Sequence, residues 1–242
     1  MPLVIAVDAG TTGVRAIAFD ERGRPVVSSH REFPQHFPRP GWVEHDAEEI
    51  WDAVQTVLGE VAAGTRDRGA TVAAIGVTDQ RETVVAWSRR TGRPLHRAIV
   101  WQDRRTAERC EALEAAGHLP LVRATTGLVL DPYFSASKLE WLFGPGGVPV
   151  DDDLAVGTID SWLLWKLTGG AVHATDTSNA SRTMLFDITE RAWSPTLAEL
   201  FGVPLAALPE VLPSSGRFGT TAAEAACGPG IPISGVAGDQ QA

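Results

Sequence analysis

The stretch Val4-Ile5-Ala6-Val7-Asp8-Ala9-Gly10-Thr11-Thr12-Gly13 joins an apolar, strand-like run to a turn of glycines and threonines. Such a turn lets the backbone approach a ligand closely and directs N–H and hydroxyl donors at a phosphate. Asp8 can hold Mg²⁺ directly or through water, because hard cations prefer oxygen ligands. The alternative is a plain hairpin turn of small residues. The residues expected to contact phosphate groups are Thr11, Thr12, Gly13 and Arg15.

A second aspartate stands in a similar setting near the other end of the sequence. Asp239 follows Gly238 and the apolar residues 229–236, which we expect to form a strand. Both aspartates therefore stand at the end of a strand-like run, next to a small residue. We expect Asp239 to belong to a functional site, as we do Asp8.

Composition narrows the class of protein. The chain has 242 residues, which suffice for one large domain or two small ones. The net charge of −9 argues against a nucleic-acid partner, which would require a basic surface. The two cysteines have no metal-ligand spacing and are expected to be reduced thiols. With neither a signal-peptide pattern nor a membrane-length apolar run, a cytoplasmic location and no membrane span are expected.

The pattern of apolar residues predicts alternating strands and helices. Residues 3–7, 14–19 and those from Val26 onward read as an antiparallel β-meander. A helix is expected after Asp46, which with Glu49 fits a capping box. Further strands are expected at 72–78, 83–87, 98–101, 154–158 and 229–236, and further helices at 104–116, 137–143, 160–167 and 195–201, with one more capped by Thr221 and Glu224. This mixture predicts one α/β domain: a mixed central sheet with an antiparallel N-terminal meander, flanked by helices.

Familiar nucleotide and hydrolase motifs do not occur in the sequence. There is neither a Gly-x-x-x-x-Gly-Lys-Ser/Thr loop nor a Gly-x-Gly-x-x-Gly or Gly-x-Ser-x-Gly motif, and the histidines lack zinc spacing. A nucleotide would therefore have to bind at the Asp8–Gly13 turn. Taken singly, Arg81 and Glu82 read as a surface ion pair, Trp101 as a core residue and Tyr133 as an interior phenol.

Longer segments resemble one family throughout the chain. Asp8-Ala9-Gly10-Thr11-Thr12 after a first strand resembles the phosphate loop of the actin-like ATPases, which include the FGGY carbohydrate kinases. Gln80-Arg81-Glu82-Thr83 and Gly238-Asp239-Gln240-Gln241 sharpen this resemblance, which is greatest to the glycerol kinases of that family. The other matching segments are residues 40–46, 99–105, 127–136, 157–165, 179–186 and 235–237. The resemblance implies an actin-like, ribonuclease H-like fold.

The resemblance also implies roles for single residues. Asp239 resembles the catalytic base, and Trp101 resembles an apolar wall against the carbon backbone of glycerol. Gln240 is expected to line the same pocket or to orient the waters of the metal. A small triol needs several donors and acceptors in a fixed pocket with one flat apolar face, and this set supplies them. The residues implied to bind the glycerol hydroxyls are Arg81, Glu82, Tyr133 and Asp239. ATP and Mg²⁺ are the implied cofactors, with Asp8 as metal ligand.

The resemblance implies ATP-dependent phosphorylation of glycerol to sn-glycerol 3-phosphate, with residues 1–242 as the substrate-binding domain. The nucleotide-binding domain of the family would be absent from this chain, which is then expected to be inactive alone. Whether the full-length enzyme forms a homo-oligomer stays open. Two alternatives also stay open. Ala9 and Gly13 match members that phosphorylate other polyols or ketoses such as xylulose, and a non-catalytic polyol-binding module is the other reading.

Overall fold

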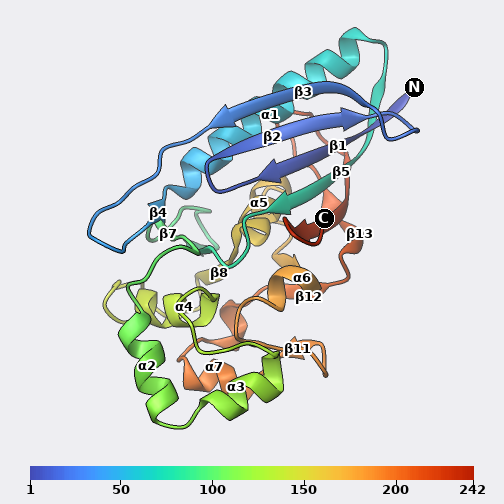
Figure 1. The fold of residues 1–242 in the computed structure, drawn as a ribbon. Coiled ribbons are helices and arrows are strands. Elements are labelled where there is room, and N and C mark those ends of the chain that lie inside the picture. The colour runs from blue at the N-terminus through green and yellow to red at the C-terminus, as the bar shows by residue number, and fades with distance from the viewer.

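Two β-sheets organise the computed structural model, which describes residues 1–242 (Figure 1). The larger sheet has six strands in the order β13-β14-β5-β1-β2-β3. Their bounds are β1 Pro2–Ala9, β2 Gly13–Phe19, β3 Pro25–Glu32, β5 Thr71–Asp79, β13 Ser215–Thr220 and β14 Pro232–Gly238. Strands β1, β2 and β3 form the predicted antiparallel meander, whereas β5 runs parallel to both β1 and β14. The prediction of a mixed sheet with an antiparallel start is confirmed.

Helix α1, Ala47–Asp67, lies along one face of this sheet and packs against β1, β2 and β3 (Figure 1). Its apolar stripe is fully buried, as the helical spacing of Ile50, Val54, Val57 and Val61 predicts. Asp46 caps the helix by accepting a hydrogen bond from Glu48 N at 2.9 Å. The reciprocal half of the expected capping box does not form, because the Glu49 carboxylate contacts His36 Nε2 at 3.1 Å instead.

The smaller sheet continues the fold towards the helical part of the molecule. Its order is β4-β7-β6-β8, and every residue of these strands is buried. The strands are β4 Glu44–His45, β6 Val84–Ser88, β7 Ala98–Ile99 and β8 Leu154–Thr158. Helix α5, Ile159–Leu167, follows β8 directly and joins the core shared with α1 and the larger sheet.

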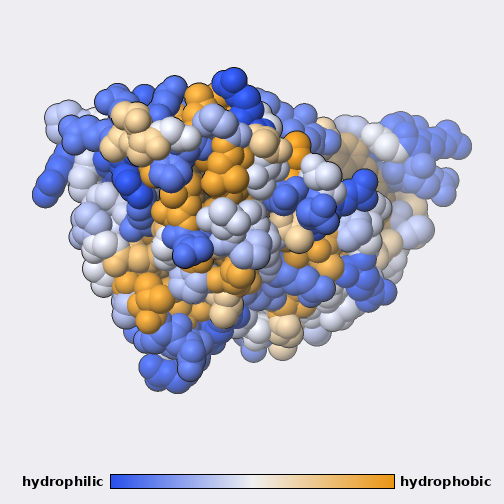
Figure 2. All heavy atoms as spheres, turned by 90° about the horizontal axis from the view of Figure 1, so that it is seen from below, coloured by the Kyte–Doolittle hydropathy of each residue, from blue (hydrophilic) through white to orange (hydrophobic).

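Most of the remaining helices cover a second apolar core, at the lower end of Figure 1. They are α2 Ala107–Ala115, α3 Leu119–Thr126, α4 Ser135–Phe143, α7 Pro195–Leu200 and the 3₁₀ turn η1 Leu205–Ala207. The short helix α6 Thr177–Ala180 packs against β14 instead. Short strand pairs complete the region: β9 Ala174–Asp176 with β12 Glu210–Leu212, and β10 Phe186–Asp187 with β11 Ala192–Trp193. On the face seen from below, apolar side chains gather in patches bordered by hydrophilic ones (Figure 2).

Two further local features differ from the sequence prediction. The sequence pattern does not predict α3, which ends at Gly127 in the left-handed conformation at φ 71°. The helix expected after Thr221 does not form. The Thr221 hydroxyl instead donates to Gly228 O at 2.7 Å and accepts from Ile231 N at 3.0 Å, so it closes a loop. No helix of the structure combines the length and the apolar character needed to cross a membrane.

Candidate active site

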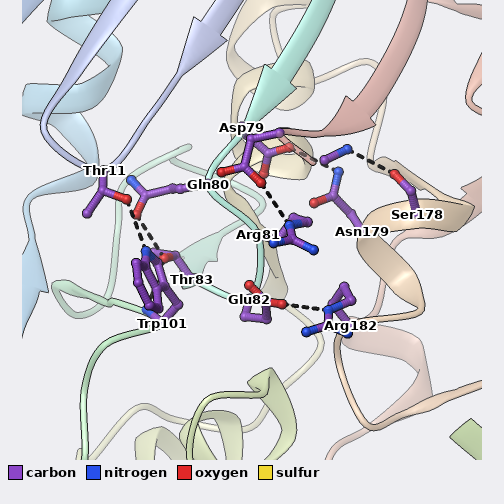
Figure 3. A network of polar contacts seen from close by, with 12 residues as sticks. Thr11, Asp79, Gln80, Arg81, Glu82, Thr83, Trp101, Ser178, Asn179 and Arg182 are labelled. Carbon is purple, nitrogen blue, oxygen red and sulfur yellow. Dashed lines mark hydrogen bonds and ion pairs between the residues drawn. The ribbon is translucent and has the colours of Figure 1, made fainter. Parts of the chain in front are cut away.

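The candidate site lies where three neighbouring parallel strands end. Strands β14, β5 and β1 are adjacent, and Gly238 and Ala9 both pair with Asp79 at the last position of β5. The segments that leave these strands therefore start side by side at one edge of the sheet. Ligands commonly bind at the carboxyl ends of strands in such sheets. The topology brings Asp8, Arg81 and Asp239 to this edge, as Figure 3 shows for Arg81 and its neighbours.

The turn between β1 and β2 has the tight form that its glycines predict. Gly10 N donates to Gly13 O at 3.0 Å, and Trp101 Nε1 donates to Thr11 Oγ1 at 3.0 Å (Figure 3). Thr12 and Arg15 are exposed. A Cβ on Gly13 would lie 2.8 Å from Arg31 O, so glycine is required there for the close approach of β2 and β3. The side chains of Thr12 and Arg15 are accessible from solvent.

Asp8 is exposed at the end of β1 and pairs in register with Arg15 of β2. Partial desolvation raises the pKa of its carboxyl; Arg15 opposes this shift and the charge of Asp239 adds to it. The carboxylates of Asp8 and Asp239 therefore lie close enough to repel each other electrostatically. No group of three His, Cys, Asp or Glu side chains forms a ready-made metal cage. Mg²⁺ usually keeps several waters and takes one or two carboxylates, so a site built on Asp8 fits its chemistry.

Asp239 is held by an ion pair. Arg81 Nε donates to Asp239 Oδ1 at 2.8 Å, and Asp239 N donates to the carbonyl of Asp79 at 3.0 Å. The Arg81 side chain is 4% exposed and that of Asp239 is 42% exposed. A buried guanidinium thus fixes a carboxylate that stays accessible from solvent. Arg guanidinium groups carry five donors, so one contact leaves others for a ligand.

Glu82 is buried in an unusual backbone conformation. Its φ is 62°, which is uncommon for a residue other than glycine, and its carbonyl accepts from Ser135 Oγ at 3.0 Å. Arg182 Nε donates to Glu82 Oε1 at 2.7 Å (Figure 3). Burial raises the pKa of the Glu82 carboxyl, whereas Arg182 and Arg81 lower it. Backbone strain of this kind often occurs at functional sites.

Trp101 and Tyr133 form an aromatic corner. Their rings meet edge to face with centroids 5.5 Å apart, and the Arg182 guanidinium lies 5.6 Å from the Tyr133 ring. Both aromatic residues line an open cavity of about 480 Å³. The other lining residues are Gln102, Arg104, Val129, Asp131 and Phe134. This cavity is large enough for a small polyol and is partly apolar, but Arg81, Glu82 and Asp239 do not line it.

Residues 3–242 match the model for the N-terminal domain of the FGGY family of carbohydrate kinases. The chain belongs to this family. It is 52% identical over 248 residues to a glycerol kinase of Alcanivorax borkumensis, across 100% of this chain and 49% of that protein. It is 53% identical over 243 residues to a glycerol kinase of Bordetella parapertussis, across 99% and 48%.

Solved structures of the same family superpose closely on this FGGY domain. A Plasmodium falciparum glycerol kinase with ADP matches at a TM-score of 0.96 and 33% identity, over 100% of this chain and 49% of that one. A xylulose kinase of Rhodospirillum rubrum matches at a TM-score of 0.89 and 26% identity, over 98% and 49%. The predicted actin-like fold is confirmed. This chain spans about half the length of the curated relatives it matches.

The FGGY domain brings most of the predicted site residues together in pairs. Arg81 forms an ion pair with Asp239, and Trp101 contacts both Thr11 and Tyr133. The charges of Arg15 and Asp239 act on the pKa of Asp8. Gln240 is exposed in the turn after β14, and no side-chain hydrogen bond joins it to the other site residues. Its expected place in the pocket stays a prediction.

The sequence pattern gives no role to Arg182, which contacts both Glu82 and the ring of Tyr133. Nor does it predict the buried polar cluster behind the site. Asn179 Nδ2 donates to Asp79 Oδ1 at 3.0 Å; Figure 3 shows both residues. The same nitrogen also donates to Asp176 Oδ1 at 2.9 Å. Burial, and then the neighbouring Asp160, raise the pKa of the Asp79 carboxyl. The segment Asn179-Ala180-Ser181-Arg182 was part of the family resemblance, and that was the only available signal for these residues.

Proposed function

We propose that residues 1–242 form the substrate-binding N-terminal domain of an ATP-dependent kinase that phosphorylates glycerol to sn-glycerol 3-phosphate. The nucleotide-binding domain would correspond to the half of its relatives that this chain does not match. The 52–53% identity to proteins named glycerol kinase supports glycerol as the acceptor. The single observation that carries the proposal is the ion pair between Arg81 and Asp239. It lies at the same edge of the sheet as the Asp8–Gly13 turn, which we call the phosphate turn.

In this proposal glycerol binds beside the aromatic corner. Trp101 covers its carbon backbone, and Tyr133 contacts a hydroxyl from the neighbouring wall. Glu82 and Asp239 accept hydrogen bonds from hydroxyl groups, while Arg81 donates to one. Because the ion pair and Arg182 already fix these side chains, little ordering is left for substrate binding.

Asp239 would orient the attacking hydroxyl and accept its proton as the new phosphorus–oxygen bond forms and the bond to the ADP oxygen breaks. The transition state of phosphoryl transfer is loose, so positioning and charge neutralisation count for more than the strength of the base. A carboxylate held by one buried guanidinium at 2.8 Å suits this task, since its orientation is fixed while it stays accessible.

On the phosphate side, Thr11, Thr12 and the backbone of Gly13 would donate to phosphate oxygens, and Arg15 would supply positive charge. Asp8 would hold Mg²⁺, directly or through water. The chemistry that the ion supplies is neutralisation of charge on the transferred group. Gln240 would border the acceptor side of the same cleft.

The test uses two preparations. Calorimetry on the 242-residue chain should show glycerol binding, and the Glu82→Gln variant should lose it, whereas Glu190→Gln on an exposed turn should retain it. A coupled assay of the enzyme that carries both halves should show glycerol-dependent ATP turnover. Faster turnover of xylulose than of glycerol across a polyol panel would contradict the proposed substrate. Glycerol-dependent turnover by the 242-residue chain alone would contradict its assignment as one half of the enzyme.

A further inference from the structure

A pair of glutamine side chains holds the phosphate turn from behind. Gln35 Nε2 donates to Thr11 O at 2.8 Å, and Gln80 Nε2 donates to Gly10 O at 3.1 Å. Gln35 comes from the segment after β3, and Gln80 follows β5 directly. Consecutive carbonyls of the turn are therefore fixed by amide groups from separate parts of the chain. Gly10 N already donates to Gly13 O, but the N–H groups of Thr11 and Thr12 have no partner in the structure and can face a phosphate.

His45 links the two glutamines. Its Nε2 lies 2.6 Å from Gln35 Oε1, and its Nδ1 lies 3.2 Å from Gln80 Nε2. Because the Gln80 amide nitrogen can only donate, Nδ1 must accept, and the ring proton must be on Nε2. Both contacts thus require a neutral imidazole with one defined tautomer. His45 is fully buried, and its ring meets the Phe33 ring edge to face at 5.0 Å. Burial lowers the pKa of His45 to about 4, so the ring is neutral at pH 7.

The same network reaches the acceptor pocket. Gln80 Oε1 accepts from Thr83 Oγ1 at 3.0 Å, and Thr83 Oγ1 accepts from Trp101 N at 3.2 Å. Trp101 Nε1 then donates to Thr11 Oγ1 at 3.0 Å, which closes the ring of contacts (Figure 3). The phosphate turn and the aromatic wall are therefore connected through polar side chains. Buried polar networks are stabilising only when every member has its partners, so each link restricts the geometry of the others.

We propose that His45 is a positioning residue that fixes the phosphate turn and its register with the acceptor pocket. The inference rests on the kinase function proposed above. His45 touches no substrate in this assignment; it acts through Gln35 and Gln80 on the carbonyls of Gly10 and Thr11. An apolar side chain could fill the same space beside Phe33 but could not orient two amide groups.

The experiment compares His45→Leu, His45→Gln and His36→Gln in the enzyme that carries both halves. The leucine variant should raise the KM for ATP and lower kcat, each roughly 10-fold, because small displacements of a positioned group are costly. The KM for glycerol should change by less than about twofold, since Thr83 and Trp101 are connected to His45 only indirectly, through Gln80. The glutamine variant keeps a donor towards Gln35 and should recover part of the loss.

His36→Gln is the matched control, because His36 contacts Glu49 and not the turn. A leucine variant with an unchanged KM for ATP, or one that raises both KM values equally, would refute the positioning role. If the unmodified enzyme shows no glycerol-dependent turnover, the proposed function fails separately. NMR of ¹⁵N-labelled chain then decides the inference: the imidazole must show the Nε2–H tautomer at pH 7, and the Trp101 indole N–H must exchange faster in His45→Leu. A charged ring or an Nδ1–H tautomer would overturn it.

Discussion

Arg81 and Asp239, which are 158 residues apart in the chain, form a 2.8 Å ion pair across the ends of β5 and β14. The guanidinium is buried and the carboxylate is 42% exposed. Such a pair contributes little to stability when one partner is open to water. Its effect is to orient Asp239, and this relationship leads to the first two predictions.

Asp239→Asn should abolish most turnover without unfolding the domain. The amide has nearly the shape of the carboxylate but cannot accept the proton of the attacking hydroxyl, so kcat should fall by about 10²–10⁴-fold. The melting temperature should stay within a few degrees, because the side chain is half-exposed. Steady-state kinetics of the enzyme with both halves measures the effect, with Asp152→Asn on an exposed loop as control. Full activity in Asp239→Asn would exclude Asp239 as the base.

Gly238→Ala should weaken glycerol binding by displacing Arg81. A Cβ at position 238 would lie 2.5 Å from Arg81 Cγ and still closer to Cδ. Since the Arg81 side chain is 4% exposed, it has little room to yield. We expect about 1–3 kcal/mol of destabilisation from overpacking, and at least about a 10-fold loss of glycerol affinity. Calorimetry and thermal unfolding of the 242-residue chain measure both effects.

Gly235→Ala is the matched control on the same strand, because its Cβ would meet Ser214 O at an ordinary 3.7 Å. That variant should bind glycerol as the unmodified chain does. Equal losses in both variants would show that the strand, and not the position of Arg81, controls binding.

The buried contacts of His173 predict that the folded chain loses stability as the pH falls. His173 Nε2 donates to Val156 O at 2.9 Å, and Arg89 Nη1 donates to Nδ1 at 3.1 Å, so the ring must be neutral. Burial is the main reason that its pKa falls to about 4 from the ordinary 6.5. Between these two pH values the unfolded chain binds a proton that the folded chain does not. Stability from this residue is therefore complete above pH 6.5 and is lost as the pH falls towards 4.

The measurement compares the unmodified chain with His173→Gln by urea unfolding from pH 7.5 to 4. The unmodified chain should lose about 2–3 kcal/mol more than the variant over this range. Parallel pH curves for the two proteins would show that His173 does not titrate in this way.

The sequence predicts the strands and turns of this site better than it predicts the contacts between them. Residues 2–32 form a meander because their alternation and turn residues are local signals, and the Asp8–Gly13 turn follows from them. The meeting of Arg182 with Glu82 spans 100 residues and depends on how the four-residue helix α6 packs. No local pattern specifies which carboxylate an arginine will reach. A lone histidine such as His45 likewise carries no signal of the two amides that it joins.

The contact of Arg182 with Glu82 gives the last prediction. Without the guanidinium, the buried Glu82 carboxylate would lose its nearest positive partner, and its already raised pKa should rise further. Glycerol hydroxyls need the ionised form as acceptor. In Arg182→Gln the KM for glycerol should therefore rise by roughly 10-fold at neutral pH. It should rise further as the pH falls, because protonated Glu82 accumulates at a higher pH than in the unmodified enzyme.

Arg182→Lys, which keeps the charge but not the planar contact with the Tyr133 and Phe134 rings, should be intermediate. Arg123→Gln on the exposed face of α3 serves as control and should show the unmodified pH profile. If KM for Arg182→Gln is raised by the same factor at every pH, Arg182 shapes the pocket without holding Glu82 ionised.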